Sequence, residues 1–154
     1  MQPILVLGIG NILLRDEGVG VRVVEAMREL PLPDDVELVD GGTSGADLVD
    51  LIADRRRLIV VDAIDAGSPP GSVFRLRPQD LVPEAGDSIS LHQIGVVESL
   101  HIAGQLGCLP GETVILGIQP GAIEPGLTLT DALAAAVPRA VEAILAEVRR
   151  ARGD

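Results

Sequence analysis

Aromatic residues are almost absent from this chain of 154 residues, which has no Trp, no Tyr and a single Phe, Phe74. Proteins that bind single-stranded nucleic acid commonly stack the bases on aromatic side chains, so this mode of binding is excluded. Lysine is absent as well, because all twelve basic residues are arginine. Catalysis through a lysine Schiff base and phosphate binding by a P-loop lysine are therefore excluded.

Cysteine and positive charge are also scarce. Cys108 is the only cysteine, so the chain can form neither an internal disulfide nor a cysteine-rich zinc site. The formal net charge of −11 repels phosphate backbones and anionic lipids, which makes nucleic acid and membrane surfaces poor partners. No apolar run approaches the ~20 residues that cross a bilayer, and the N-terminus lacks the pattern of a signal peptide. We expect a cytoplasmic protein with a reduced thiol.

What remains is an aliphatic chain, 47% hydrophobic, that can bury a core as a single domain over residues 1–154. Apolar strand-like runs alternate along it with amphipathic helical patterns. We expect strands at 4–7, 36–39, 58–61, 73–77 and 114–118. We expect helices at 17–29, 44–53 and 92–106, and a long C-terminal helix that Pro138 should kink or restart.

The connection between the third and fourth expected strands is informative because it is short and contains Pro69-Pro70-Gly71. A parallel crossover needs a dozen residues or more, so the fourth strand should run antiparallel to the third. The pattern predicts an α/β fold: a three-layer α/β/α sandwich whose five-stranded twisted sheet is mostly parallel, with one antiparallel strand and helices on both faces. Ligands of such sheets bind beyond the carboxyl ends of the strands.

A glycine pair, Gly8 and Gly10, follows the first expected strand and resembles the start of a dinucleotide-binding loop. The third glycine of that fingerprint should fall at position 13, where this chain has Leu13. Asp40 closes the second strand and would correspond to the acid that binds ribose. A Rossmann-like nucleotide-binding module is therefore one alternative, and a tight turn that needs positive φ is the simple structural explanation.

Three residues near the ends of expected elements are candidates for chemistry: Glu17, Asp62 and His92. Asp16 can cap the first helix, which leaves Glu17 in its first turn, where the helix dipole favours a carboxylate. Asp62 ends an apolar strand and would be desolvated unless a metal, another cation or backbone amides pair with it. If Ser90 caps the next helix, His92 stands in a first turn that favours neutral imidazole. Two carboxylates and one imidazole can hold a divalent ion, but spacing alone does not show that they meet.

Five ordered blocks of the sequence are similar to the motifs of hydrogenase maturation proteases. These blocks are Gly8–Gly20, Asp40–Thr43, Val61–Ala63, Ser90–Gly95 and Gly117–Pro120, the last extended by Glu124-Pro125. The resemblance covers the chain from end to end in the family's order. It implies an endopeptidase that removes the C-terminal extension of a nickel–iron hydrogenase large-subunit precursor after nickel has been inserted.

The resemblance also implies roles for individual residues. Glu17, Asp62 and His92 match the family's metal-contacting positions, and Asp40 matches a residue near the site. Nickel is expected to arrive with the precursor, so that the enzyme reads the metal as a sign of completed insertion. Other divalent ions can occupy the same ligands, and we expect the enzyme to be a monomer.

A hydrolytic mechanism follows from what the chain offers. A nucleophilic serine, cysteine or threonine arrangement is not evident, so activated water is the natural nucleophile. A metal would polarise the scissile carbonyl and lower the pKa of bound water. We predict that Asp16 or Asp40 is the catalytic base. A related peptidase acting on another precursor and a purely structural domain remain as alternatives.

Overall fold

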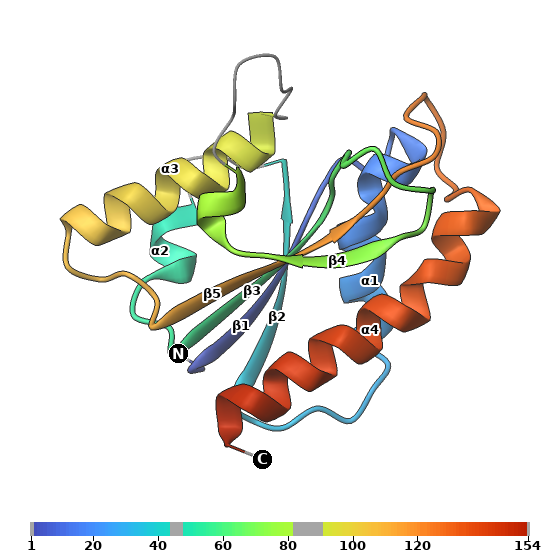
Figure 1. Cartoon of the computed structure of the whole chain (residues 1–154). Coiled ribbons are helices and arrows are strands. Elements are labelled where there is room, and N and C mark those ends of the chain that lie inside the picture. Colours follow the sequence, from blue (N-terminus) through green and yellow to red (C-terminus); the bar gives the residue numbers. More distant parts are fainter. Residues whose placement is uncertain (1, 44–47, 82–90, 154) are drawn as a thin grey trace.

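The computed structural model describes residues 2–43, 48–81 and 91–153, without the side chains of residues 91–94. Within these residues a twisted sheet has the strand order β2-β1-β3-β5-β4 (Figure 1). The parallel strands are β1 (Ile4–Ile9), β2 (Val36–Gly42), β3 (Arg57–Ala63) and β5 (Glu112–Ile118). The remaining strand, β4 (Val73–Leu76), runs antiparallel along β5.

Helices cover both faces of the sheet (Figure 1). One face carries α1 (Val19–Met27) and α4 (Asp131–Arg152), and the other carries α2 (Val49–Ile52) and α3 (Leu91–Gln105). Two short 3-10 helices, η1 (Arg15–Gly18) and η3 (Pro78–Leu81), lie in the connections. The predicted three-layer α/β/α sandwich with one antiparallel strand is confirmed. No helix in the described ranges is both long and apolar enough to cross a membrane.

Strand alternation divides the core into two layers. Along β1, Ile4 and Val6 pack toward α1 and α4, whereas Leu5 and Leu7 pack toward α2 and α3. Every residue of β1 is buried, as expected for a central parallel strand covered on both faces. This is why the sequence reads as a continuous apolar run at 4–7.

Two expectations differ in detail from the structure. The fourth strand has the predicted direction, but it pairs with β5, because β5 occupies the position beside β3 and leaves β4 at the edge. The C-terminal helix continues through Pro138, so the predicted restart is wrong, whereas a kink at Pro138 stays a prediction. Ala134, whose carbonyl loses its usual partner to the proline, is exposed, so water can satisfy it. The expected helix at 44–53 is described only from residue 48, and residues 44–47 lie outside the described ranges.

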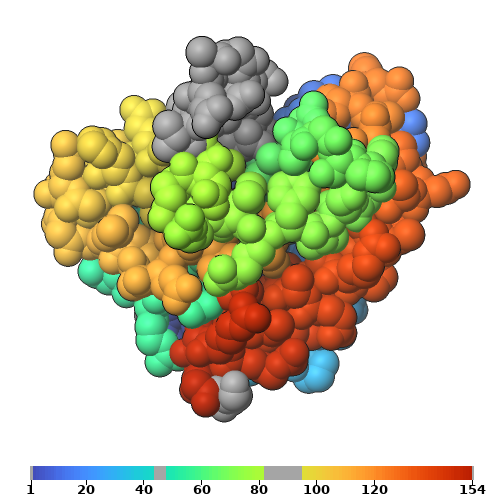
Figure 2. All heavy atoms as spheres, in the orientation of Figure 1, coloured from blue at the N-terminus to red at the C-terminus, as the bar shows by residue number. Residues whose placement is uncertain are grey.

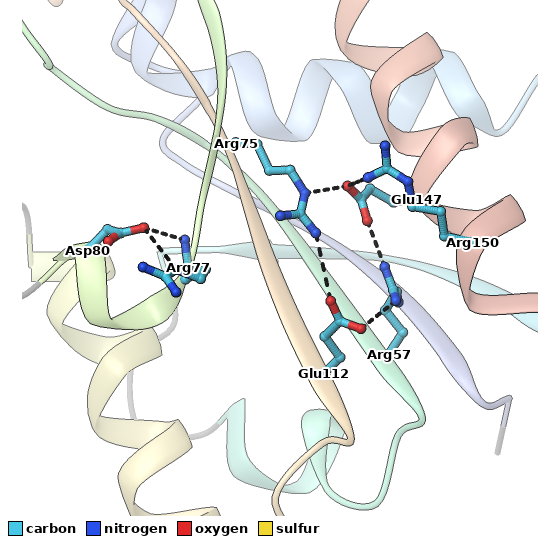
Figure 3. A network of polar contacts seen from close by, with 7 residues as sticks. All are labelled: Arg57, Arg75, Arg77, Asp80, Glu112, Glu147 and Arg150. Carbon is cyan, nitrogen blue, oxygen red and sulfur yellow. Dashed lines mark hydrogen bonds and ion pairs between the residues drawn. The ribbon is translucent and has the colours of Figure 1, made fainter.

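An ion network with a buried centre, Arg57 and Glu147, fastens α4 to the sheet (Figure 3). Glu147 of α4 is 2% exposed and accepts hydrogen bonds from Arg57 of β3 at 2.7 Å and from Arg75 of β4 at 2.6 Å. Arg150 donates to the same carboxylate at 2.9 Å, and Glu112 pairs with both Arg57 and Arg75. Because Arg57 and Glu112 begin their strands, the network lies at the amino end of the sheet.

We expect Glu147→Ala to lower the free energy of unfolding by about 3–5 kcal/mol, because it leaves the buried Arg57 guanidinium without its buried counter-charge. Urea unfolding at pH 7 measures the change. Glu142→Ala, an exposed position on the same helix, is the matched control and should change the free energy by less than about 0.5 kcal/mol. An equally small change for both variants would show that the network contributes no stability.

Candidate functional site

The carboxyl ends of the parallel strands bring several of the predicted site residues to one edge. Gly8 of β1 pairs with Asp40 of β2 on one side and with Val61 of β3 on the other. Asp40 and Asp62 therefore lie at the same edge of the sheet, separated by the end of β1. This edge, called the carboxyl edge below, is where ligands bind in open α/β sheets.

Close backbone approaches bring Glu17 to the carboxyl edge. Gly10 has a φ of +143°, and a Cβ at this position would overlap the carbonyl oxygen of Glu17. A Cβ on Gly20 would overlap the carbonyl oxygen of Val61 and would lie 2.5 Å from that of Ile9. Only glycine permits these contacts, so η1 and the start of α1 rest directly on the ends of β1 and β3. Glu17, which is partly buried, is held beside both strands.

Asp62 lies in β3 and is only 2% exposed. Leu58 and Val60 of the same strand pack in the layer of α2 and α3, whereas Ile59 and Val61 pack in the layer of α1 and α4. Because side chains alternate along a strand, Asp62 faces the layer of α2 and α3. The carboxylate is therefore buried on the side of the sheet that α3 covers.

The direction of α3 places its first turn at the carboxyl edge. The carbonyl of Cys108, just after the helix, accepts a hydrogen bond from the Asp54 amide at 2.9 Å, at the amino end of β3. The fifteen residues of α3 extend it by about 22 Å, roughly the length of the strands, back to the carboxyl edge (Figure 1). The backbone of His92 thus lies at the same edge and on the same face as Asp62. The side chain of His92 and the predicted capping residue Ser90 lie outside the described residues.

The sequence predicts Asp16 as the cap of the first helix, but this prediction is wrong. Asp16 lies within η1, and the residue before α1 is Gly18. Its fully buried carboxylate accepts hydrogen bonds from the amides of Gly121 at 2.9 Å and Ala122 at 2.8 Å. The amide and the hydroxyl of Thr130 both donate to it at 2.8 Å. Burial raises the pKa of Asp16, but the hydrogen bonds from Thr130, Ala122 and Gly121 outweigh it and hold the pKa below its ordinary value. A carboxylate occupied in this way is suited to anchoring a loop.

Asp40 has a different environment. The residue is exposed at the carboxyl edge, and its Oδ1 accepts a hydrogen bond from the Gly42 amide at 2.8 Å. The Gly42 carbonyl in turn accepts from the Gly10 amide at 2.8 Å, which ties the ends of β1 and β2 together. Of the two carboxylates predicted as catalytic base, Asp40 is the accessible one.

Gln119 supports this edge and was not identified from the sequence. It is 6% exposed, and its Oε1 accepts hydrogen bonds from the amides of Ala66 at 2.7 Å and Ser68 at 3.2 Å. Its Nε2 donates to Asp65 at 3.1 Å, and this bond, together with one from the Gly67 amide, lowers the pKa of Asp65. Gln119 thereby holds the loop after β3 to the end of β5. A polar residue directly after a buried apolar strand was the available signal, the same one that identified Asp62.

The described side chains include Glu17 and Asp62 of the predicted ligand set, but not that of His92. Among them, no group of three or more His, Cys, Asp and Glu residues is close enough to hold a metal ion. Glu17 and Asp62 are described and lie at the carboxyl edge. The imidazole would have to come from His92, so the three-residue set stays a prediction.

Comparisons with known proteins agree on one family. A family model described as hydrogenase maturation protease matches residues 21–147. The chain is 40% identical over 148 residues to the Hydrogenase 2 maturation protease of Escherichia coli, covering 95% of this chain and 90% of that protein. It is 43% identical over 150 residues to the hydrogenase expression/formation protein HupD of Rhizobium leguminosarum, covering 95% and 74%.

Solved structures give the same result. The hydrogenase maturating endopeptidase HybD from E. coli superposes with a TM-score of 0.88 at 40% identity, over 97% of this chain and 93% of that one. A hydrogenase 2 maturation peptidase from a Thaumarchaeota archaeon superposes with a TM-score of 0.74 at 32% identity, over 96% and 98%.

The anchoring role of Asp16 predicts a pH-dependent stability. Asp16→Asn keeps the shape of the side chain but removes its charge, and hydrogen bonds to a charged group contribute about 1.5–3 kcal/mol each. We expect the variant to be less stable by at least ~2 kcal/mol at pH 7. Because the folded-state pKa lies below the ordinary 3.8, the carboxylate's contribution is complete above that value and is lost as the pH falls through the lower folded-state pKa.

The difference in unfolding free energy between wild type and Asp16→Asn should therefore be largest near neutral pH and shrink at acid pH. Urea titrations at several pH values measure it. Asp34→Asn, an exposed position, controls for the general titration of carboxylates. An Asp16→Asn difference that is independent of pH would contradict the anchoring role of the ionised carboxylate.

Proposed function

Since this chain belongs to the hydrogenase maturation protease family and is therefore a protease, we propose that it removes the C-terminal extension of a nickel–iron hydrogenase large-subunit precursor. The observation that carries this proposal is the convergence of η1, the end of β3 and the first turn of α3 at the carboxyl edge. These elements hold Glu17, Asp62 and His92, which match the family's metal-contacting positions. The substrate is then a protein whose metal centre must reach this edge.

We propose that Glu17, Asp62 and His92 contact nickel carried by the precursor. Carboxylates and imidazole suit a borderline divalent ion, and a set of three leaves positions for the precursor's own ligands. Asp62 is only 2% exposed, and contact with a cation is compatible with this burial, because opposite charge offsets the cost of desolvating a carboxylate. The metal is cargo of the substrate in this scheme, and contact with it lets the protease distinguish loaded from empty precursor.

We propose that Asp40 is the base for hydrolysis and that Asp16 holds the surrounding loop. Asp40 takes a proton from water as the water oxygen attacks the scissile carbonyl. The carbon–nitrogen bond then breaks, and the proton passes to the leaving amine. Asp40 is exposed enough to meet water, whereas the carboxylate of Asp16 is buried and fully hydrogen-bonded.

The nucleotide-binding alternative is not favoured. A phosphate would have to approach the turn at Gly10, where the carbonyl of Glu17 packs instead. Two acidic residues, Asp16 and Glu17, occupy the short helix that follows this turn, and their charge opposes that of a phosphate. Leu13 stands where the third glycine of the fingerprint belongs.

The two aspartates at the carboxyl edge should respond differently to substitution. We expect Asp40→Asn to slow cleavage of nickel-loaded precursor by ~100-fold or more while precursor affinity is kept, because the change removes a base and preserves shape. Asp62→Asn should also weaken precursor binding, because it removes a metal contact. Gel analysis of the processed subunit measures cleavage, and a binding titration measures precursor affinity. Asp50→Asn, at an exposed position of α2, is the control. Cleavage by Asp40→Asn at the wild-type rate would place the base elsewhere.

The metal content of the precursor should decide whether it is cleaved. We expect wild-type enzyme to process nickel-loaded precursor and to leave nickel-free precursor intact over the same period, because the contacts to Glu17, Asp62 and His92 are then missing. Mass spectrometry of the subunit's C-terminus measures the outcome. In the control, nickel-free precursor is mixed with enzyme that has been incubated with nickel, and it should also stay intact. Efficient processing of nickel-free precursor would eliminate recognition through the metal.

A further inference from the structure

Two loops from distant parts of the sequence pair with each other beside the carboxyl edge. Leu14 forms an isolated bridge with Gly126. The amide of Gly126 donates to the carbonyl of Leu13 at 2.9 Å, and the amide of Arg15 donates to the carbonyl of Gly126 at 3.1 Å. The loop that contains Leu13 and Leu14 leads directly into η1, so the loop that contains Gly126 is held next to Glu17.

Side chains lock the second loop, residues 119–130, although it contains neither a helix nor a regular strand. The buried carboxylate of Asp16 binds it through Gly121, Ala122 and Thr130. Two arginines bind its carbonyls: Arg15 donates to Thr128 at 3.0 Å and Arg22 donates to Leu127 at 2.9 Å. A segment fixed at so many points presents its outward side chains in a defined arrangement.

The outward side chains of these loops include several large apolar ones. Six large hydrophobic residues are exposed among the described residues, and three of them lie here: Leu13 at 60%, Ile123 at 54% and Leu127 at 62% exposure. We call these three residues the apolar platform. Figure 2 shows the loop that carries Ile123 and Leu127 at one corner of the molecule, in orange beside blue N-terminal residues. Exposed apolar residues gathered on a rigid support mark an interaction surface.

We propose that the apolar platform binds apolar side chains of the precursor polypeptide next to the bond that is cleaved. This inference rests on the proposed function and identifies the surface that seats the substrate. Leu13 and Glu17 lie in one short segment, so the platform is continuous with the candidate site. A polypeptide bound at Glu17 is within reach of the platform.

The charges around the platform also favour an apolar segment. The two nearby cations are each paired, Arg15 with Glu124 at 3.0 Å and Arg22 with Glu25 at 3.1 Å. The platform therefore offers apolar surface framed by neutralised charges, and a strongly charged segment would find no free counter-charge on these two arginines. An acidic stretch of the precursor is therefore disfavoured, and an apolar stretch matches the exposed leucines and isoleucine of the platform.

The test uses a variant in which the platform is made polar, Leu13→Ser/Ile123→Ser/Leu127→Ser. The matched control is Leu106→Ser/Leu109→Ser, which changes leucines of 68% and 55% exposure at the opposite, amino end of the sheet. For cleavage of nickel-loaded precursor we expect the platform variant to raise KM by roughly tenfold or more, with kcat within about twofold of wild type. The control should change neither constant by more than about twofold, and both variants should keep the wild-type unfolding midpoint.

Precursor binding is measured separately, by titrating fluorescently labelled, nickel-loaded precursor into each protein. Loss of affinity in the platform variant alone supports the inference. Unchanged KM and affinity in a variant that still cleaves would overturn the inference and leave the proposed function intact. A wild-type protein that neither binds nor cleaves the precursor would overturn both.

Sedimentation of wild type and platform variant tests the other occupant, a second copy of this chain. A wild-type dimer that becomes monomeric in the variant, with KM for the precursor unchanged, would assign the platform to self-association and overturn the inference.

Discussion

The buried carboxylate of Asp16 joins parts of the chain that lie more than a hundred residues apart in the sequence. It accepts hydrogen bonds from Gly121, Ala122 and Thr130, and Thr130 is the residue that precedes α4. One charged group thereby fixes η1, the 119–130 loop and the start of the C-terminal helix. Glu17 is its direct neighbour in sequence. The position of the candidate site and the shape of the surface beside it both depend on this carboxylate remaining ionised in a dry environment, which its hydrogen bonds make favourable.

Buried carboxylates at the two ends of the sheet are compensated by different groups. At the amino end, Glu147 is surrounded by the guanidinium groups of Arg57, Arg75 and Arg150, so opposite charges compensate one another. At the carboxyl end, backbone amides and a hydroxyl compensate Asp16, while the nearby Arg15 and Arg22 pair with Glu124 and Glu25. The first arrangement holds α4 in place. The second keeps the edge acidic, with Asp40 and Glu17 beside it, and this suits contact with a cation.

Local sequence patterns predicted the helices and strands better than they predicted which distant strands and residues these contact. Continuous apolar runs marked β1, β3 and β5, because a parallel strand covered on both faces has no polar side. The pairing of β4 with β5 could not be read in the same way, since it depends on which distant strand takes the position beside β3. Asp16 shows the limit most clearly. Its place before a helical pattern favoured a cap, but its partners lie 105 to 114 residues away, beyond the reach of any local rule.

The site residues likewise divide into those that a local sequence pattern indicated and those that depend on long-range contacts. Asp62 was found because an acid closing a buried apolar run is unusual, whereas Gln119 entered the sequence analysis only as part of the Gly117–Pro120 block and was given no role. The rule that ligands bind beyond the carboxyl ends of parallel strands indicated where Glu17 and Asp62 should lie, but it did not show that their side chains meet. What that rule did not supply was the close approach of Gly20 to the carbonyls of Ile9 and Val61, which brings η1 over the strand ends.

A rigid frame has a particular value for a protease that acts on one folded partner. Under the proposed function, the precursor touches the enzyme at its metal and at an apolar stretch, and neither contact needs to be strong. When both surfaces belong to one fixed frame, binding at the first holds the second at a high effective concentration, so the two weak contacts together exceed either alone. Because Asp16 and Arg15 fix the 119–130 loop to the segment that carries Glu17, the distance between the two contacts is set by the fold. A precursor lacking the metal would retain only the apolar contact, and the scissile bond would not be held at the carboxyl edge long enough for hydrolysis.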